Sequence, residues 1–538
     1  MPRIHLVSNR PGAAALGEHL RGAGLGPTSA RAADALLVLI DRPLDTVEQD
    51  LLDRARQSVP VLLAGPTLGA LPADSPLVEA TGLVPARTIP PYELRVATGL
   101  HGQEVGLRLD PDQRFVDSWV LVDKVADDVQ RLLTVRYELA EQPICTWRPS
   151  TGLGVLTLGG SEDTLADPAF QRLVGRWLRY ALDVHDRPPV RVGVLGTTDS
   201  AVAHAAAART TPGLELGAVT ESAAGPSIAG PDAGAWVRRY TTPTELVADP
   251  DLGLIAVCTR SNTRAEWGMR ALEAGKHVVI EAPHSLSTHD ADELTTLAAE
   301  RELTVSTMPG PGEIPAYRAA AAAVRRGAVG TVFWIEVAAT SFRRPEGTWH
   351  DDTRLSGGQL FDRGAAPVGW LLGLTDGPVE WVSATSRKHA WHDVTNADHS
   401  RILLRCADGT EAQITLSDVE AYPRPAFCIQ GTEGTLVGPP TPGAGTAAGP
   451  LGDPGGGGGA GGADGPAGMM LYRADGVVAR LPVPVSSGRS GDGHRALADH
   501  LVSGWPLPAS ATEARAVISV LEAAARSAAT NGASTVPE

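Results

Sequence analysis

The sequence predicts an α/β protein built from three successive domains. The chain has 538 residues, which at about 150 residues per domain gives roughly three. Short apolar runs typical of buried strands alternate with amphipathic, helix-like segments through the first 307 residues. From residue 331 the pattern becomes strand-rich and is closed by one helix at about 510–529. These observations predict a flavodoxin- or amidotransferase-like domain, a Rossmann-type domain, and an α/β domain with an open antiparallel sheet.

The first domain is expected over residues 1–186. It begins with apolar runs that have the composition and length of buried parallel strands, separated by amphipathic segments. We expect strands at 4–8, 35–40 and 60–65, a helix at 46–57 and a closing helix at about 167–183. HDRPPV, at 185–190, is typical of a linker.

Composition excludes several classes of function. The formal net charge of −16 and pI of about 5.4 disfavour binding to phosphate backbones, so no nucleic-acid partner is expected. The cysteines are scattered, without a CxxC pair, and are expected to be reduced core residues and not a metal site: Cys145, Cys258, Cys406 and Cys428. The first residues lack the apolar core of a signal peptide, and no apolar run reaches about 18 residues. We therefore expect a cytoplasmic protein with no membrane partner.

The second domain, expected over 190–307, opens with RVGVLGTTDSAVAH at 191–204. A buried strand, a tight turn and a helix in this order are typical of a dinucleotide-binding unit. Gly196 holds the first glycine position and Ala201 the third, small position, but Thr198 stands where the second glycine lets backbone approach the pyrophosphate. The helix start still attracts an anion, and Glu221 follows the next strand where an acidic residue would take ribose hydroxyls. The alternative is a βαβ unit kept for packing alone.

Longer blocks extend this similarity. The sequence from 242 to 283 includes ALEAGKHV at 271–278, and it is followed by SGGQLFDRG at 356–364 and CIQGTEGTLVG at 428–438. In order and spacing these blocks resemble the Gfo/Idh/MocA family, which includes glucose-fructose oxidoreductase and inositol dehydrogenase. The resemblance covers about 190–538. It implies a C-terminal α/β domain over 308–538, into which a Gly/Pro-rich segment at 438–468 is inserted; its composition predicts a disordered loop.

The resemblance also implies NAD or NADP as cofactor and a sugar, polyol or amino-sugar substrate. In such a reaction hydride leaves a carbinol carbon while a base takes the hydroxyl proton. The family supplies that chemistry from a lysine in E-K-P and a histidine in D-x-G-x-H-x-x-D. Here the lysine position is Ala282, the histidine position is Ala366 and the later aspartate position is Gly369. The P-N-x-x-H motif has lost its proline and its histidine, since it runs from Arg260 to Arg264. The usual proton relay is therefore absent.

Two residues are candidates to replace it. His284 directly follows the altered E-K-P motif and is the best substitute acid or base; the alternative is that it caps the next helix. Asp362 is retained and could bond a substrate or a turn. TWHDDTR, with His350, Asp351 and Asp352, lies where the family often approaches substrate, although a solvated acidic loop is the simpler interpretation.

The cleft also gains cations. Arg260 and Arg264 could grip an anionic ligand or pair with Glu266 on the surface, and Lys276 is interpreted as a surface lysine. The expected cofactor-binding set is Gly196, Thr197, Thr198, Ala201, Glu221, Thr259, Arg260, Glu281 and Pro283.

The end of the first domain resembles ThuA-like domains, named for trehalose utilisation, which share the class I amidotransferase fold. The similar features, within 143–182, are Trp147, a glycine-rich strand and DPAFQRLV at 167–174; Gly159-Gly160 stands where Gly-His is frequent. An amidotransferase needs a cysteine on the turn after its third strand, but the comparable turn, Ala64 to Thr67, has none. We expect this domain to bind a carbohydrate-like ligand or to serve assembly.

Three hypotheses follow. The chain is an oxidoreductase-like protein with lost or altered dehydrogenase activity, such as a pseudoenzyme or a sensor of a nucleotide or sugar ligand. It is an active NAD(P)-dependent enzyme that uses non-standard groups. Or it is a scaffold that partners an active relative. A homodimer or homotetramer is expected because open sheets of this kind commonly form oligomer contacts.

Overall fold

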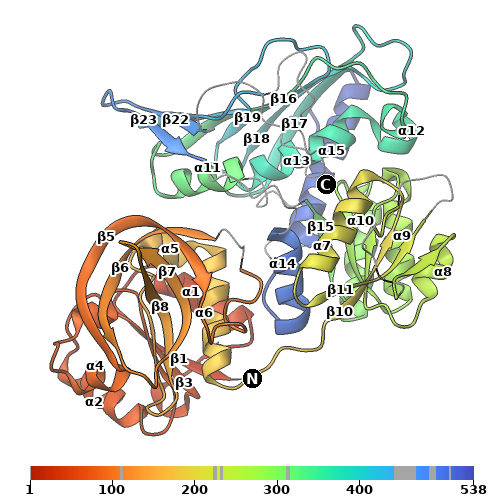
Figure 1. Ribbon diagram of the computed structural model, residues 1–538. Helices are drawn as coiled ribbons and strands as arrows, with labels where there is room; N and C mark the ends of the chain where they lie inside the picture. Colours follow the sequence, from red (N-terminus) through yellow and green to blue (C-terminus); the bar gives the residue numbers. More distant parts are fainter. Residues whose placement is uncertain are drawn as a thin grey trace. The chain divides into compact units, whose positions relative to one another are not determined.

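The computed structural model describes residues 2–109, 113–221, 227–230, 234, 236–309, 315–441, 468–483, 492–507 and 511–537. It forms two compact units, coloured along the chain in Figure 1. The first unit contains Met1–Pro189 and Ala498–Pro506, and the second contains Val190–Leu497 and Leu507–Glu538. Residues 498–506, expected within the third domain, therefore pack in the first unit. Residues 442–467 of the expected disordered loop lie outside the described residues.

The first unit is built on a nine-stranded sheet of order β2-β1-β3-β4-β9-β8-β7-β5-β6. Five neighbouring strands are parallel: β2 (Gly26–Pro27), β1 (Arg3–Ser8), β3 (Ala35–Leu39), β4 (Val61–Ala64) and β9 (Leu153–Leu156). Four antiparallel strands extend the sheet: β8 (Ala140–Arg148), β7 (Gln130–Tyr137), β5 (Leu83–Thr98) and β6 (Arg114–Val125). The three predicted parallel strands are confirmed.

Helices cover both faces of the parallel part. Leu37 and Leu39 of β3 share a core with α1 (Ala13–Gly22) and α6 (Pro168–Ala181). Leu36 and Val38, on the opposite face, share another core. That second core receives α2 (Thr46–Ala55), α3 (Thr67–Ala70) and α4 (Pro76–Thr81). Because alternate residues face opposite sides of a strand, continuous apolar runs mark strands buried on both faces. The short α5 (Glu162–Ala166) precedes α6.

The nucleotide-binding half of the second unit is a parallel sheet of order β12-β11-β10-β13-β14-β15. Its strands are β10 (Val190–Leu195), β11 (Leu214–Thr220), β12 (Arg238–Tyr240), β13 (Leu254–Val257), β14 (His277–Glu281) and β15 (Val305–Met308). Its helices are α7 (Asp199–Thr210), α8 (Pro243–Ala248), α9 (Ser261–Glu273) and α10 (Thr288–Glu300). This is the predicted Rossmann-type order, in which ligands bind beyond the strand ends where the order reverses, here between β10 and β13.

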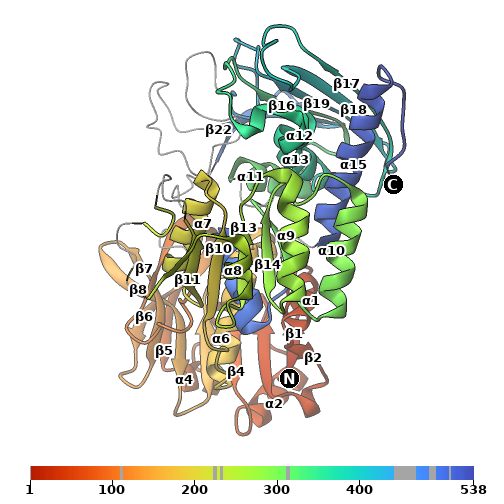
Figure 2. The ribbon, with the colours of Figure 1, turned by 90° about the vertical axis from the view of Figure 1, so that its right-hand side faces the viewer.

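The other half of this unit is an eight-stranded, largely antiparallel sheet of order β17-β18-β19-β16-β20-β21-β22-β23. Its strands are β16 (Val332–Thr340), β17 (Val379–Arg387), β18 (His399–Cys406), β19 (Glu411–Ser417), β20 (Phe427–Gly431), β21 (Gly434–Val437), β22 (Gly468–Arg473) and β23 (Val478–Pro482). α11 (Pro315–Arg325), α13 (Gly358–Leu372) and α15 (Ala511–Ala529) share its core, and Figure 2 shows α13 and α15 along the sheet. The open sheet is confirmed.

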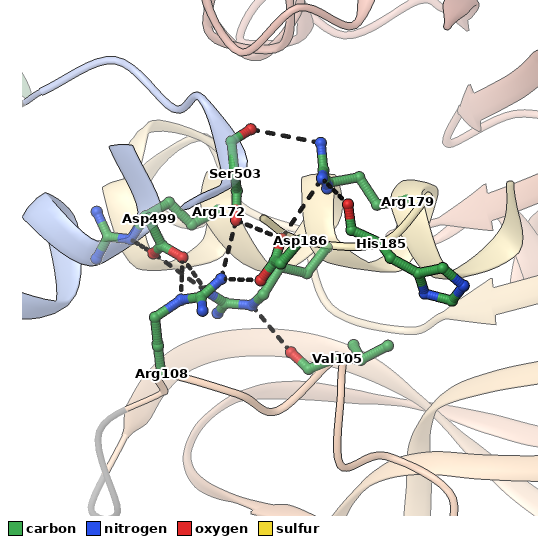
Figure 3. Close-up of polar contacts among 9 residues, drawn as sticks. Val105, Arg108, Arg172, Arg179, His185, Asp186, Asp499 and Ser503 are labelled. Carbon is green, nitrogen blue, oxygen red and sulfur yellow. Dashed lines mark hydrogen bonds and ion pairs between the residues drawn. The ribbon is translucent and has the colours of Figure 1, made fainter. Parts of the chain in front are cut away.

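A short segment returns to the first unit. After α14 (Asp492–Ala498) the chain forms a π-helical turn, Asp499–Ser503, and residues 498–506 pack in that unit; we call them the clasp. Trp505 is fully buried, and its ring lies so close to Gly175 of α6 that a Cβ there would be 1.6 Å from it. Asp499 is buried and accepts a 2.6 Å hydrogen bond from Arg108, with Arg176 at 3.2 Å (Figure 3). A hydrophobic anchor and a buried ion cluster thus hold the clasp.

Candidate nucleotide and substrate site

The turn after β10 has the backbone of a nucleotide-binding turn. Gly196 has φ +137°, and a Cβ there would lie 2.1 Å from the carbonyl oxygen of Cys258, so only glycine fits. Its N–H donates to Thr220 Oγ1 at 2.8 Å. Ala201 is fully buried, as the third, small position requires. The predicted first and third positions therefore have the expected geometry.

The second position differs. Thr198 caps α7: its Oγ1 accepts from the N–H of Ala201 and donates to the carbonyl of Cys258 at 3.2 Å. Asp199, exposed, is the first residue of the helix and puts a carboxylate where the helix dipole would favour a pyrophosphate. Thr197 is exposed. Thr198 and Asp199 therefore stand at the part of the turn that would face the phosphates of a dinucleotide.

Glu221 lies at the end of β11 with its carboxylate already engaged. Its Oε1 accepts from Ser227 Oγ at 2.9 Å and from the N–H of Ala229, and its Oε2 lies 3.0 Å from Arg239 Nε. Oε2 has one described partner, so its second acceptor site is open to a ribose hydroxyl beside Arg239. The residue keeps the geometry of a ribose-binding carboxylate, with part of its acceptor capacity used by Ser227, Ala229 and Arg239.

A buried arginine ties the two sides of the cleft together. Arg264, in α9, is 2% exposed, and its guanidinium donates to Glu281 Oε2 at 2.8 Å and to the carbonyl oxygens of Ala282 and Pro283. Ser200 Oγ, from the first turn of α7, donates to the same Glu281 oxygen at 2.8 Å. The backbone after β14, where the family lysine would stand, is thus fixed by Arg264.

This arrangement corrects one expectation. Arg264 neither grips an outside anion nor pairs with Glu266, because Glu266 pairs with Arg270 at 2.7 Å. Arg264 Nε donates to the carbonyl of Thr259, so Thr259 serves this network through its backbone. Arg260, by contrast, is exposed at the start of α9.

Lys276 is not a surface lysine, as was expected. It is 7% exposed, and its Nζ donates to the carbonyl oxygens of Asp249 and Leu252 at 2.9 and 2.6 Å. Burial lowers its pKa, partly offset by Asp249 and Asp251. Lys276 therefore joins two turns of the Rossmann-type domain, and it does not replace a residue of the proton relay.

His284 is buried as well. It is 3% exposed, and burial lowers its pKa to about 4. The expectation that it caps the next helix is wrong: α10 is capped by Ser287, whose Oγ accepts from the N–H of Asp290. A neutral imidazole with almost no exposed surface is poorly suited to exchange protons with a sugar-sized ligand.

A second histidine is far better placed. His350 Nδ1 lies 2.8 Å from Asp362 Oδ1, and the His350 side chain is half exposed. The ring of Trp349 stacks on it at 3.7 Å, and the guanidinium of Arg264 lies 5.8 Å from the centre of the Trp349 ring. These contacts link the Rossmann-type half of the site to α13.

The loop around His350 is not the solvated acidic loop that was expected. Asp351 accepts from the N–H groups of Gly347 and Thr348, and Asp352 caps α12 (Thr353–Ser356). Both aspartates are therefore used to fold the loop as turns. That folding sets the position of His350.

The helix α13 presents the altered histidine position to the same side. Asp362 and Ala366, one turn apart, are both partly exposed, whereas Ala365, Pro367 and Gly369 are buried. Residues at i and i+4 of a helix share a face. His350 therefore lies against the helix face on which the family histidine would stand.

The first unit has no nucleophile at its comparable turn. β4 ends at Ala64, Gly65 has φ +63°, and α3 begins at Thr67. Thr67 is fully buried, with its hydroxyl donating to the carbonyl of Ala64 at 2.6 Å, and Cys145 is buried in β8 with a raised pKa. This agrees with the expectation that glutamine hydrolysis is absent.

Within the described ranges, no cluster of three or more histidine, cysteine or acidic side chains could hold a metal ion. None of the described helices is long and apolar enough to cross a membrane. The order of the parallel sheet, its reversal between β10 and β13 and the glycine turn after β10 together define a Rossmann-type nucleotide-binding domain.

Comparison with known proteins agrees. Residues 190–308 match the oxidoreductase family with an NAD-binding Rossmann fold, and residues 317–437 match the GFO/IDH/MocA C-terminal domain. A dTDP-3,4-didehydro-2,6-dideoxy-alpha-D-glucose 3-reductase of Actinomadura kijaniata is 30% identical over 242 residues, 44% of this chain and 70% of that protein. The chain belongs to the Gfo/Idh/MocA oxidoreductase family, and it has that family's NAD-binding Rossmann fold.

Other relatives match over less of their length. A 1,5-anhydro-D-fructose reductase of Ensifer adhaerens is 28% identical over 37% of this chain and 61% of its own. An uncharacterised oxidoreductase of Schizosaccharomyces pombe is 27% identical over 37% of this chain, and the match spans 56% of that protein. Among solved structures, Synechocystis biliverdin reductase in complex with biliverdin and NADP+ has a TM-score of 0.53 at 20% identity, covering 63% of this chain and 99% of that one. It shows the shared fold.

Proposed function

We propose that this protein is an altered Gfo/Idh/MocA oxidoreductase, which binds a nicotinamide nucleotide weakly beside a sugar-like ligand and has lost the family's usual relay. The observation that carries the proposal is the pair of methyl groups, Ala282 and Ala366, at the lysine and histidine positions of a site that keeps its glycine turn. A methyl group neither takes nor gives a proton. The sugar-linked names of the Actinomadura and Ensifer relatives support a sugar-like ligand.

Weak nucleotide binding follows from the contacts of the turn. Gly196 leaves the backbone free to approach a pyrophosphate, but Thr198 fills the second glycine position and Asp199 repels negative charge. Glu221 already shares its carboxylate with Ser227 and Arg239, which leaves fewer acceptor sites for a ribose. The cofactor is NAD or NADP; Glu221 suits a ribose hydroxyl, whereas its partner Arg239 suits a 2′-phosphate.

The first unit, in this proposal, is a ThuA-like domain that binds a carbohydrate-like ligand or serves assembly. The protein acts in the cytoplasm as a homo-oligomer or beside an active relative, with the open sheet as the contact face. A pure scaffold, without nucleotide, is the competing account.

The test is a titration of the full chain with NADH and with NADPH, followed by energy transfer from protein to nicotinamide. Binding at micromolar to sub-millimolar concentration is expected. Sugars and polyols are then screened for an effect on that affinity. Absence of binding up to millimolar nucleotide would contradict the proposal and favour the scaffold. Arg239→Ala separates the two nucleotides: weaker NADPH binding with unchanged NADH binding is expected if Arg239 meets the 2′-phosphate.

A second candidate is an enzyme that transfers protons through other groups. His350, which is half exposed and paired with Asp362 on the helix that carries Ala366, favours it.

A further inference from the structure

We propose that His350 is the proton-transferring catalytic residue of this site and that Asp362 is its positioning residue. His350 thereby replaces the histidine whose place Ala366 occupies. This inference rests on the proposed binding of a nicotinamide nucleotide and a sugar-like ligand, and it goes further by assigning the chemistry to a side chain from a loop outside the family motifs.

The two ring nitrogens of His350 have different surroundings. Nδ1 is held by Asp362 Oδ1 at 2.8 Å, which fixes the ring and, with the proton on Nδ1, leaves Nε2 as the acceptor. No described residue makes a hydrogen bond to Nε2, and half of the side chain is exposed. A ring oriented by a carboxylate on one nitrogen and open on the other has the arrangement that general acid–base catalysis needs.

His350 also lies on the side of α13 that carries Asp362 and Ala366. Asp362 is four residues before Ala366 on α13, so both lie on the partly exposed face of that helix. His350 reaches this face from the turn Trp349–Asp351, whose fold is fixed by the Asp351 capping contacts. The imidazole of His350 therefore comes from a neighbouring turn and lies on the side of α13 from which the family's histidine would project.

Charged groups around the His350 ring affect its pKa. Burial acts to lower the pKa of His350, but the hydrogen bond and charge of Asp362, together with the charge of Glu281, raise it overall, while Arg264 opposes them. The result is a pKa above its ordinary value, which makes the ring a stronger base than a free imidazole. No comparable balance exists at His284, whose pKa is about 4.

The step balances as follows. When the ligand is a secondary alcohol, Nε2 of neutral His350 takes the hydroxyl proton, the O–H electrons form the carbonyl, and the carbinol hydrogen leaves with its electron pair to the oxidised nicotinamide nucleotide. In the reverse direction protonated His350 gives its Nε2 proton to the carbonyl oxygen as hydride arrives from the reduced nucleotide. The Asp362 carboxylate orients the ring and stabilises the imidazolium.

The test has two parts, and the first needs no turnover. The histidine ring of His350 is titrated by NMR in full-length, histidine-labelled protein, with His350→Ala used to assign its signal. Its pKa is expected above 6.5 and is expected to fall in Asp362→Asn, which removes the carboxylate charge. A pKa unchanged by Asp362→Asn would overturn the positioning role.

The second part measures NADPH- and NADH-linked turnover of a panel of sugar ketones and polyols, with calorimetry of nucleotide binding on every variant. His350→Ala is expected to lower kcat by on the order of 100-fold without changing nucleotide affinity. Adding Ala366→His to His350→Ala is expected to restore part of the rate. His289→Ala, on the outer surface of α10, is the matched control and should have no effect.

The outcomes are distinct. In the alcohol-oxidising direction the rising limb of the pH–rate profile should move to lower pH in Asp362→Asn, because the base then loses its proton at lower pH. Full turnover in His350→Ala, or nucleotide binding with no turnover of any panel member by the wild type, overturns the assignment of His350. Absence of nucleotide binding overturns the proposed function itself.

Discussion

At the scale of single residues, Arg264 fixes much of the backbone around the candidate site. It occupies the last position of the altered P-N-x-x-H motif, and it holds the backbone at Ala282 and Pro283 where the family carries its lysine. A buried guanidinium needs partners for its donors, and here Glu281 and three carbonyl oxygens supply them. Arg264 therefore fixes the backbone on both sides of the Ala282–Pro283 bond.

Replacing Arg264 should test this. Arg264→Ala leaves Glu281 without its ion pair and three carbonyls without a donor, so the free energy of unfolding should fall by about 3 kcal/mol. Urea denaturation followed by far-UV circular dichroism measures it. Arg260→Ala, an exposed arginine one turn away, should change stability by less than about 0.5 kcal/mol. Equal effects of the two substitutions would contradict the buried network.

At the residue scale, some features of the site could be predicted from the sequence and others could not. The losses at Ala282, Ala366 and Gly369 are readable from the motifs because those positions are fixed by neighbouring family residues. The burial of Arg264, Lys276 and His284 was not readable, since no periodicity reports which polar side chain the fold encloses. The pairing of His350 with Asp362 joins a loop to a helix, and only the suspicion that this loop lies near substrate pointed to it.

At the scale of elements, the clasp is the feature that the sequence concealed. Strands at 4–8, 35–40 and 60–65 in the first sheet and the strand that opens the second sheet were predicted because fully buried strands have continuous apolar runs. Residues 498–506 have no such run, and Arg108 and Arg176 lie more than 300 residues away from Asp499 in sequence. Such a long-range ion cluster leaves no local pattern.

The clasp should contribute strongly to the stability of the first unit. Trp505→Ala removes a fully buried indole from its place beside Gly175 and His19, and should lower the free energy of unfolding of this unit by about 3–5 kcal/mol. Differential scanning calorimetry of the full chain measures the shift. Trp236→Ala, at an exposed tryptophan, is the control and should leave the transition in place. An unchanged transition in Trp505→Ala would contradict the role of the clasp.

At the scale of the whole molecule, the chain connects its two units three times, and histidines with lowered pKa values lie in both. His19 in the first unit and His204 and His284 in the second have pKa values lowered to about 4, mainly by burial. An unfolded histidine takes up its proton near pH 6.5. The folded protein therefore binds fewer protons than the unfolded chain between these values, and stability must fall as the pH drops from 6.5 to 4.

The share of this acid sensitivity that His284 contributes can be measured separately. Between pH 7 and pH 5 His284 alone should cost about 2 kcal/mol of unfolding free energy by this linkage. His284→Gln removes the titrating group, so its loss of stability over the same range should be smaller by about that amount, whatever its stability at pH 7. Urea denaturation at both pH values gives the comparison. Identical losses in the two proteins would show that His284 is not a buried neutral imidazole.

The central claim is that the family's nucleotide cleft persists but is weakened at its phosphate turn. The most direct measurement is calorimetric titration of NADH and NADPH into wild-type protein and into Thr198→Gly. Glycine restores backbone approach to the pyrophosphate, while loss of the cap costs only a few tenths of a kcal/mol. Weak binding by the wild type, tightened at least several-fold by Thr198→Gly, is the predicted result. No binding by either protein up to millimolar nucleotide would contradict the account.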